Sequence, residues 1–239
     1  MRIVTKGIVA LLLSVSPVRA MDDGAFFWRV DGLVERRASS VAPDTAWQGA
    51  AWIGGDRDKI RFETMGVLGD DGGIDNEGGT VGVDNRLFYS RMIAPFWDAK
   101  AGLQVSVFDK GEKRVGFLAG VQGLAPQGVH IDAVAGVTNT GVVSARFEAT
   151  YDILLTQKLI AQPFVEAVLA SSDDSAIRLG SGLSRVESGL RLRYEIEKEF
   201  APFIGVSFEQ FTGATAGYVA ADGGQTSKLR VLAGLKVWF

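Results

Sequence analysis

Apolar and polar residues alternate along much of the chain, and the clearest example lies between residues 190 and 197. In this stretch Leu190, Leu192, Tyr194 and Ile196 alternate with two arginines and two glutamates. Successive side chains of a β-strand point to opposite faces, so this period of two predicts a strand with one apolar and one charged face. The same alternation recurs in residues 99–107 and 143–152. An all-β fold is therefore expected.

Extended along the chain, the pattern predicts about twelve strands. Their expected ranges are 26–36, 45–53, 58–67, 79–92, 97–107, 114–123, 127–138, 141–153, 158–170, 184–197, 200–212 and 227–239. Tight turns alternate with connections that are mostly longer, polar and glycine-rich, such as GDDGGIDNEG and TGATAGYVAADGGQTS. Short turns on one rim and longer loops on the other are typical of an up-and-down meander closed into a barrel. The expected fold is a single antiparallel β-barrel with no internal domain boundary.

Residues 1–20 have the pattern of a secretory signal peptide. Arg2 and Lys6 precede an apolar run from Gly7 to Val15, which is too short to cross a bilayer as a helix of about 20 residues. The sequence Val18-Arg19-Ala20 then offers small residues for a cut after Ala20. The expected organisation is a leader of residues 1–20 followed by a barrel of residues 21–239, exported from the cytoplasm.

Alternation alone does not decide whether the apolar face meets a core or lipid. The chain ends inside a predicted strand, on VLAGLKVWF, and this resembles the C-terminal strand that the outer-membrane assembly machinery recognises, which makes Phe239 a candidate contact. Strands of about 9–11 tilted residues cross a bilayer, and bacterial barrels have an even strand number. We therefore predict a transmembrane barrel in the outer membrane of a Gram-negative bacterium, with its apolar face against lipid.

Aromatic residues also gather at one predicted rim, where they would form a girdle at the membrane–water boundary. This expected girdle consists of Phe26, Phe27, Trp28, Trp52, Phe96, Trp97, Phe200, Phe203, Trp238 and Phe239.

The charged faces are expected to enclose a hydrated lumen that is narrow or self-plugged. Its expected charge network consists of Arg61, Glu63, Asp98, Lys100, Arg146, Glu148, Glu166, Arg191, Arg193, Glu195, Glu197 and Arg230. Both signs occur on neighbouring strands, so cross-strand ion pairs are expected. The charges have two interpretations: a structural network that keeps the interior hydrated, or a pathway for a substrate.

Composition excludes several functions. The net charge of −3 gives no indication of a nucleic-acid surface. The absence of cysteine removes disulfides, thiolate metal sites and cysteine nucleophiles. An outer-membrane phospholipase would need a serine and a histidine within hydrogen-bond reach, and the single histidine, His130, is expected in the lumen, away from acyl chains. The protein is therefore not expected to be an enzyme.

Several long blocks carry a family resemblance: AAWIGGDRDK, LFYSRMIAPFWDAKAGLQ, GVQGLAPQGVHIDA and the ending GLKVWF. From about Trp47 to Phe239 the chain resembles the copper-resistance protein B family of outer-membrane barrels. The resemblance implies a role in copper tolerance, by sequestration or passage of copper, with a periplasmic copper protein as a possible partner. Many members carry a methionine- and histidine-rich stretch before the barrel, whereas here Asp22-Asp23-Gly24-Ala25 leads directly to Phe26.

The candidate copper ligands inside the barrel are His130, Asp132, Met65 and Met92. Imidazole and thioether groups suit copper, and His130 and Asp132 are two residues apart, so they share one face of a strand. A copper site requires several of these ligands to converge. A polar network between His130 and Asp132 is the alternative, and a narrow general solute channel without metal is the competing function.

Overall fold

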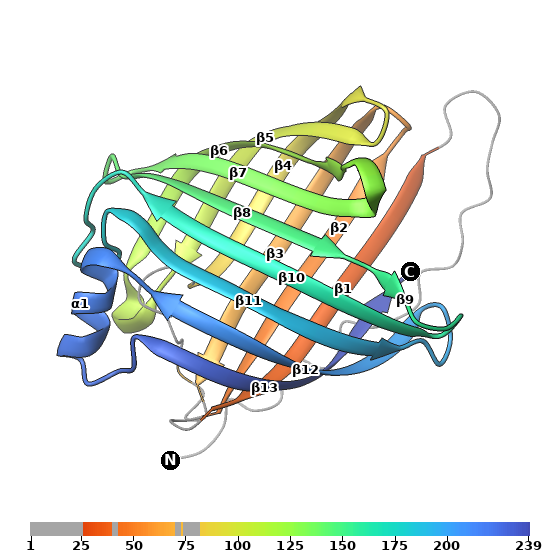
Figure 1. The fold of residues 1–239 in the computed structure, drawn as a ribbon. Helices are drawn as coiled ribbons and strands as arrows, with labels where there is room; N and C mark the ends of the chain where they lie inside the picture. Colours follow the sequence, from red (N-terminus) through yellow and green to blue (C-terminus); the bar gives the residue numbers. More distant parts are fainter. Residues whose placement is uncertain (1–25, 40–42, 70–72, 74–81) are drawn as a thin grey trace, which may run out of the picture.

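The computed structural model describes residues 26–39, 43–69, 73 and 82–239, so the predicted leader of residues 1–20 lies outside the described residues. In the part of the chain that is described, no helix is both long and apolar enough to span a membrane. The strands form one antiparallel sheet that closes into a barrel, with helix α1 (Gly213–Ala221) at one end (Figure 1).

Each predicted strand has a counterpart in the structure. The strands are β1 (Phe27–Ala38), β2 (Asp44–Gly54), β3 (Asp58–Gly69), β4 (Val83–Ala94), β5 (Trp97–Val107), β6 (Lys113–Leu124), β7 (Val129–Thr138), β8 (Val143–Tyr151), β9 (Ile153–Leu154), β10 (Leu159–Ala170), β11 (Gly182–Tyr194), β12 (Phe200–Phe211) and β13 (Ser227–Trp238). Two short 3-10 turns, η2 (Asp109–Gly111) and η3 (Pro126–Gly128), connect strands. Strand β9 continues β8 after a break at Asp152, and both pair with β10, so the barrel has twelve staves as predicted.

The barrel is closed by the first and last strands. Strand β1 pairs with β13 from Asp31 opposite Trp238 to Ala38 opposite Val231. The chain end is tied into this seam, since the amide of Phe239 donates to the carbonyl of Val30 at 2.9 Å. An open sheet edge in lipid would leave peptide groups unpaired at a cost of several kcal/mol each. Closure therefore fits the predicted membrane location.

Side-chain exposure confirms which face is which. Leu190, Ile204 and Leu229 on the outer face are 45, 63 and 70% exposed, whereas Lys100 and Arg230 on the inner face are 2 and 1% exposed. A water-soluble barrel would show the reverse, with apolar residues inside and charges outside. The apolar surface is thus turned outward, toward lipid.

The predicted aromatic girdle needs correction, because three of its members turn inward. Phe203 is only 5% exposed. The Lys59 ammonium lies 5.6 Å from the ring centre of Trp52, and the Arg193 guanidinium lies 5.9 Å from that of Trp238. Each of the three residues occupies a strand position whose side chain points into the lumen. Proximity to the rim therefore did not determine their orientation. The exposed aromatics at this rim are Phe26, Phe27, Phe96, Phe200 and Phe239.

Helix α1 lies in a segment for which only a loop was predicted. Its nine residues are rich in alanine and stand at the rim opposite the chain terminus Phe239 (Figure 1). The Oγ1 atom of Thr215 in this helix accepts a hydrogen bond of 2.8 Å from the amide of Gly180. The helix therefore packs onto the long connection between β10 and β11, and such a tertiary contact carries no periodic signal in the sequence.

Candidate functional site

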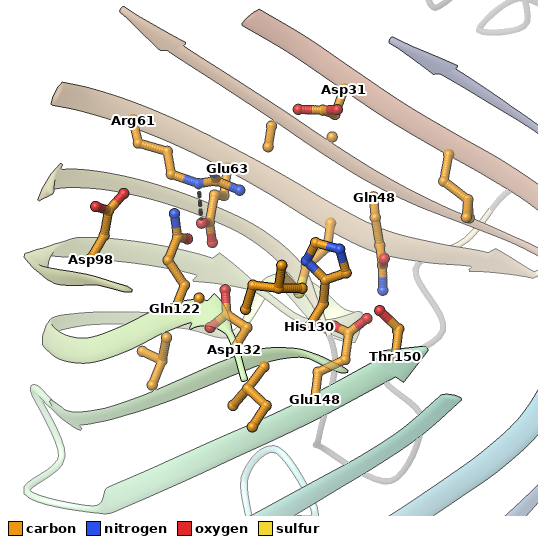
Figure 2. A pocket seen from close by; sticks show the side chains of 18 of the residues that line it. Asp31, Gln48, Arg61, Glu63, Asp98, Gln122, His130, Asp132, Glu148 and Thr150 are labelled. Carbon is orange, nitrogen blue, oxygen red and sulfur yellow. Dashed lines mark hydrogen bonds and ion pairs between the residues drawn. The ribbon is translucent and has the colours of Figure 1, made fainter. Parts of the chain in front are cut away.

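The half of the lumen nearest the short turns is a wide cavity, which we call the vestibule. Its volume is about 860 Å³, and its lining runs from Pro95 and Phe96 in the β4–β5 turn to Arg146 and Arg191 near the middle of the barrel. The charged and amide side chains of its wall point into this space from strands on opposite sides (Figure 2). The vestibule opens at the rim that carries the chain terminus.

Ion pairs along the vestibule wall join strands that are separated by one intervening strand in the sheet. Lys59 on β3 pairs with Asp98 on β5 at 2.9 Å. The ammonium of Lys100 donates to Glu63 at 3.0 Å and to Asp132 at 2.6 Å, and it also lies 4.8 Å from the ring centre of Phe88. Cross-strand pairing of this kind was expected from the mixed charges, and it occupies most of the carboxylates in the wall.

The vestibule narrows at a ring of side chains that we call its floor. The floor residues line both the vestibule and a smaller cavity beyond it, of about 40 Å³. They are Leu33, Gln48, Met65, Arg146, Glu148 and Arg191. A cavity of 40 Å³ has room for only a few water molecules. The floor is thus a constriction between the wide and the narrow parts of the lumen.

Buried ion pairs fill the lumen beyond the floor, and we call them the septum. The septum consists of Arg37, Asp44, Glu166, Arg185, Glu187, Glu209 and Arg230, which are between 0 and 6% exposed. Arg185 pairs with Glu166, with Glu187 at 3.5 Å and with Glu209 at 3.0 Å. Arg230 continues the chain of contacts to Glu209 at 3.0 Å and to Asp44 at 3.8 Å. Buried charges are tolerated when they are paired in this way.

Above the septum, residues 171–181 fold across the long-loop rim, and we call this segment the cap. The carboxylate of Asp174 accepts hydrogen bonds of 2.7 and 2.8 Å from Arg114. Arg178 pairs with Asp109 at 3.1 Å and with Asp222 at 2.7 Å. A small apolar cluster lies beneath these contacts and contains Phe108, Val142, Ala170, Ile177 and Leu179. The cap therefore has both polar and apolar anchors.

Asp174 gives the cap a dependence on pH. The hydrogen bonds from Arg114 hold the pKa of Asp174 below its ordinary value of 3.8. Hydrogen bonds from Ser181 likewise lower the pKa of the neighbouring Asp173. A carboxyl group with a depressed pKa stabilises the folded state above its ordinary pKa, and this contribution is lost as the pH falls through the lowered value. The anchor at Asp174 is thus complete at neutral pH and lost only in strong acid.

We therefore expect the cap to remain closed between about pH 7 and pH 4 and to open below that range. The chain has no cysteine, so Ser175→Cys on the exposed part of the cap provides a single position for an environment-sensitive fluorophore. Its emission should change only below about pH 4, whereas adding Asp174→Asn should give the open-state emission at pH 7. A transition near pH 6 in the parent variant would contradict this assignment.

All four predicted copper ligands line the vestibule. They do not form one coordination sphere: Asp132 is bound by Lys100 at 2.6 Å, and the sulfur of Met65 accepts a contact of 2.9 Å from Arg146. No hydrogen bond joins His130 to Asp132 among the described residues, so the alternative polar network of these two side chains is absent there. In residues 26–39, 43–69, 73 and 82–239, no three His, Asp or Glu side chains are arranged to hold a metal ion.

Glu197 does not belong to the predicted charge network of the lumen. Strand β11 ends at Tyr194, and Glu197 lies exposed in the turn before β12. The prediction extended the alternation past the strand end, where it no longer determines direction. Glu195 also lies beyond the strand but contacts Arg193 at 3.5 Å. The other members of the predicted network lie on the lumen side of their strands.

Charged lumen residues that were missed from the predicted network include Glu35, Arg37, Asp44, Arg86, Arg185, Glu187 and Glu209. The alternation did contain the signal for two of them, since Arg185 and Glu187 have the same parity as Arg191 and Arg193 on β11. The others lie near strand ends at the long-loop rim, where the strand boundaries were least certain.

Comparison with known proteins gives a family and a fold. Residues 26–239 match the family described as "Copper resistance protein B precursor". The chain is 35% identical over 206 residues to Copper resistance protein B of Escherichia coli, covering 86% of this chain and 67% of that protein. It is 36% identical over 194 residues to a Copper resistance protein B homolog of Pseudomonas syringae pv. tomato (strain ATCC BAA-871 / DC3000), covering 81% of this chain and 63% of that protein. The chain thus spans about two thirds of the length of these relatives.

Two solved porins share the fold alone, because their sequence identity is low. The NanC porin matches with a TM-score of 0.54 and 13% identity, covering 87% of this chain and 98% of the porin. The KdgM porin matches with a TM-score of 0.51 and 8% identity, covering 88% of this chain and 99% of the porin. The family match and the two copper resistance relatives show that the chain belongs to the copper resistance protein B family. With its outward apolar surface and closed strand order, it is an outer-membrane β-barrel that functions in copper resistance.

Proposed function

We propose that the barrel serves copper resistance by holding copper reversibly in the vestibule, and that it does not act as an open pore. The observation that supports this proposal is the shape of the lumen. A cavity of about 860 Å³ lies toward the short turns. Beyond its floor, where the septum begins, there is a second cavity of only about 40 Å³. A hydrated ion could enter the first space, but passage through the second would require paired buried charges to separate.

The vestibule also contains donor groups for copper. His130, Met65 and Met92 line it together with Asp132, and imidazole and thioether groups are ligands that copper accepts readily. In bacterial barrels the short turns face the periplasm. The vestibule would therefore exchange copper with the periplasm, and a periplasmic copper protein is the partner that we propose for this exchange.

Two further parts of the proposal concern export and assembly. Residues 1–20 would direct the chain out of the cytoplasm and be removed near Ala20. The C-terminal strand that ends at Phe239 would be recognised by the outer-membrane assembly machinery. We propose no catalytic role, because His130 lines the vestibule whereas acyl chains would contact the outer face of the barrel.

Copper content tests the holding function. Protein refolded into detergent and dialysed to equilibrium against copper is expected to hold about one ion per chain, since one histidine is present. His130→Ala should lose this ion, while Asp98→Asn should keep it, because Asp98 is already engaged by Lys59 at 2.9 Å. A folded wild-type barrel that retains no copper would refute the holding function.

Conductance separates this function from a general solute channel. We expect the wild-type barrel in a planar bilayer to show no steady ohmic current, with or without copper, because the septum closes the lumen. The two porins that share the fold make a general solute channel a reasonable alternative function. A stable pore whose current ignores copper would favour the channel and count against the vestibule as a copper store.

A further inference from the structure

We propose that the vestibule selects the oxidised ion Cu²⁺ and binds it through the imidazole of His130 and the carboxylate of Glu148. This inference rests on the proposed function and deepens it by naming the oxidation state and the ligand pair. It also replaces Asp132, Met65 and Met92, the ligands expected beside His130 from the sequence; Met92 lies on β4, which β5 and β6 separate from His130 on β7.

Some of the donor groups in the vestibule are already bound to other side chains. Asp132 accepts from Lys100 at 2.6 Å, and the Met65 sulfur contacts Arg146 at 2.9 Å. By contrast, the side chains of Glu148 and His130 form no hydrogen bond or ion pair with another residue in the part of the chain that the structure describes. Both line the vestibule, and Glu148 also belongs to its floor. These two side chains can therefore bind an ion without breaking an existing contact.

His130 and Glu148 lie on adjacent strands. His130 is opposite Thr150, and Asp132 is opposite Glu148, in the pairing of β7 with β8. His130 and Glu148 are thus diagonal neighbours on one face of adjacent strands, a spacing of about 7–8 Å that long side chains can bridge. In Figure 2 the side chains of His130 and Glu148 both extend into the cavity.

The charges around Glu148 also favour a bound cation. Asp132 and Glu148 are carboxylates directly opposite each other in the sheet, and like charges in this position destabilise a strand pair. Of these two carboxylates only Asp132 is bound by Lys100, which also pairs with Glu63. The nearby cations on the floor are engaged elsewhere: Arg146 with Glu166 at 2.5 Å and Arg191 with Glu35 at 3.1 Å. Glu148 thus has no cation of its own in an ion pair, and a bound cation would relieve its repulsion with Asp132.

The donor types decide the oxidation state. Thioether sulfur favours Cu⁺, whereas nitrogen and oxygen donors in a tetragonal arrangement suit Cu²⁺. The free pair here is one nitrogen and one carboxylate donor, and the described residues supply no third His, Asp or Glu ligand. Water would occupy the remaining positions, for which a cavity of about 860 Å³ has ample room. A site with two protein ligands releases its ion readily, as a store that exchanges copper with a partner must.

Titration with Cu²⁺, followed by electron paramagnetic resonance, tests this assignment on the refolded full barrel. The wild-type spectrum should show a tetragonal Cu²⁺ signal with superhyperfine coupling to one imidazole nitrogen. His130→Ala should abolish that coupling. Glu148→Gln should weaken Cu²⁺ binding at least about tenfold, since loss of even an outer-shell partner costs 10–100-fold in metal affinity. Asp98→Asn is the matched control: it removes the same charge from the same cavity but should leave the affinity unchanged.

Failure of the inference can be told apart from failure of the proposed function. Equal affinities for Glu148→Gln and Asp98→Asn would overturn the role of Glu148, and a wild-type spectrum without nitrogen coupling would overturn the site even if the variants do not fold. Retention of Cu⁺ under reducing conditions, lost in Met65→Leu or Met92→Leu, would overturn Cu²⁺ selection while the holding function stands. Binding of neither ion would refute both.

Discussion

Replacing Arg185 by alanine is expected to lower the free energy of unfolding of the barrel by about 3–5 kcal/mol. Arg185 is 2% exposed and is the shared partner of Glu166, Glu187 and Glu209, of which Glu209 is fully buried. Its loss would leave carboxylates uncompensated in the lumen, and that cost exceeds the gain the intact pairs provide. Urea unfolding in lipid vesicles, followed by tryptophan fluorescence, measures the change.

Arg61→Ala is the control for this prediction. The guanidinium of Arg61 pairs with Glu63 at 2.6 Å in the wider vestibule, where its side chain is 20% exposed. Glu63 would keep Lys100 as a partner at 3.0 Å, so a loss of no more than about 1 kcal/mol is expected. Equal losses for the two variants would mean that the septum carries no special share of the stability.

Replacing Leu190 by arginine is expected to destabilise the barrel by about 2–4 kcal/mol, because a charged side chain near the bilayer midplane loses its hydration. Leu190 lies near the middle of β11, faces outward and is 45% exposed. In a water-soluble barrel the same exchange at an exposed position would change stability by no more than about 0.5 kcal/mol. Reversible unfolding in vesicles therefore tests directly which solvent the outer face meets.

Tyr194→Arg provides the matched comparison on the same face of the same strand. Tyr194 is 48% exposed and is the last residue of β11, at the short-turn rim. Near the membrane interface the cost of an arginine falls to about 0–1 kcal/mol. If both positions tolerated arginine equally well, the lipid-facing assignment would be wrong.

The strands could be predicted from the sequence because every strand has one face toward lipid and one face toward the hydrated lumen. Where alternation is strict, as in residues 99–107, the period of two gives both the element and the face of each side chain. Even the ambiguous run on β4 follows this rule, since Leu87 and Tyr89 are exposed outward while Phe88 between them is fully buried. Helix α1 could not be predicted in this way, because it depends on contacts with the cap.

The candidate site could be predicted only in part, and the reason is register. Alternation places His130, Asp132 and Glu148 on the lumen side, but it does not say which carboxylate already has a partner. Which carboxylate has a partner depends on contacts between strands that are distant in the sequence, such as that of Lys100 with Asp132. Arg191 and Glu35, another such pair, are 156 residues apart. The septum was predicted only in part, through Glu166 and Arg230, because its members come from six strands whose order in space follows only from closure.

The position of the first described strand has a consequence for tethered delivery. Strand β1 begins at Phe27, opposite Gly54 at the short-turn rim, so a polypeptide joined ahead of it emerges beside the mouth of the vestibule. A copper-carrying peptide grafted there through a short flexible linker would reach the cavity at an effective concentration in the millimolar range. Loading would then become an intramolecular transfer, independent of how dilute free copper is in the surrounding compartment.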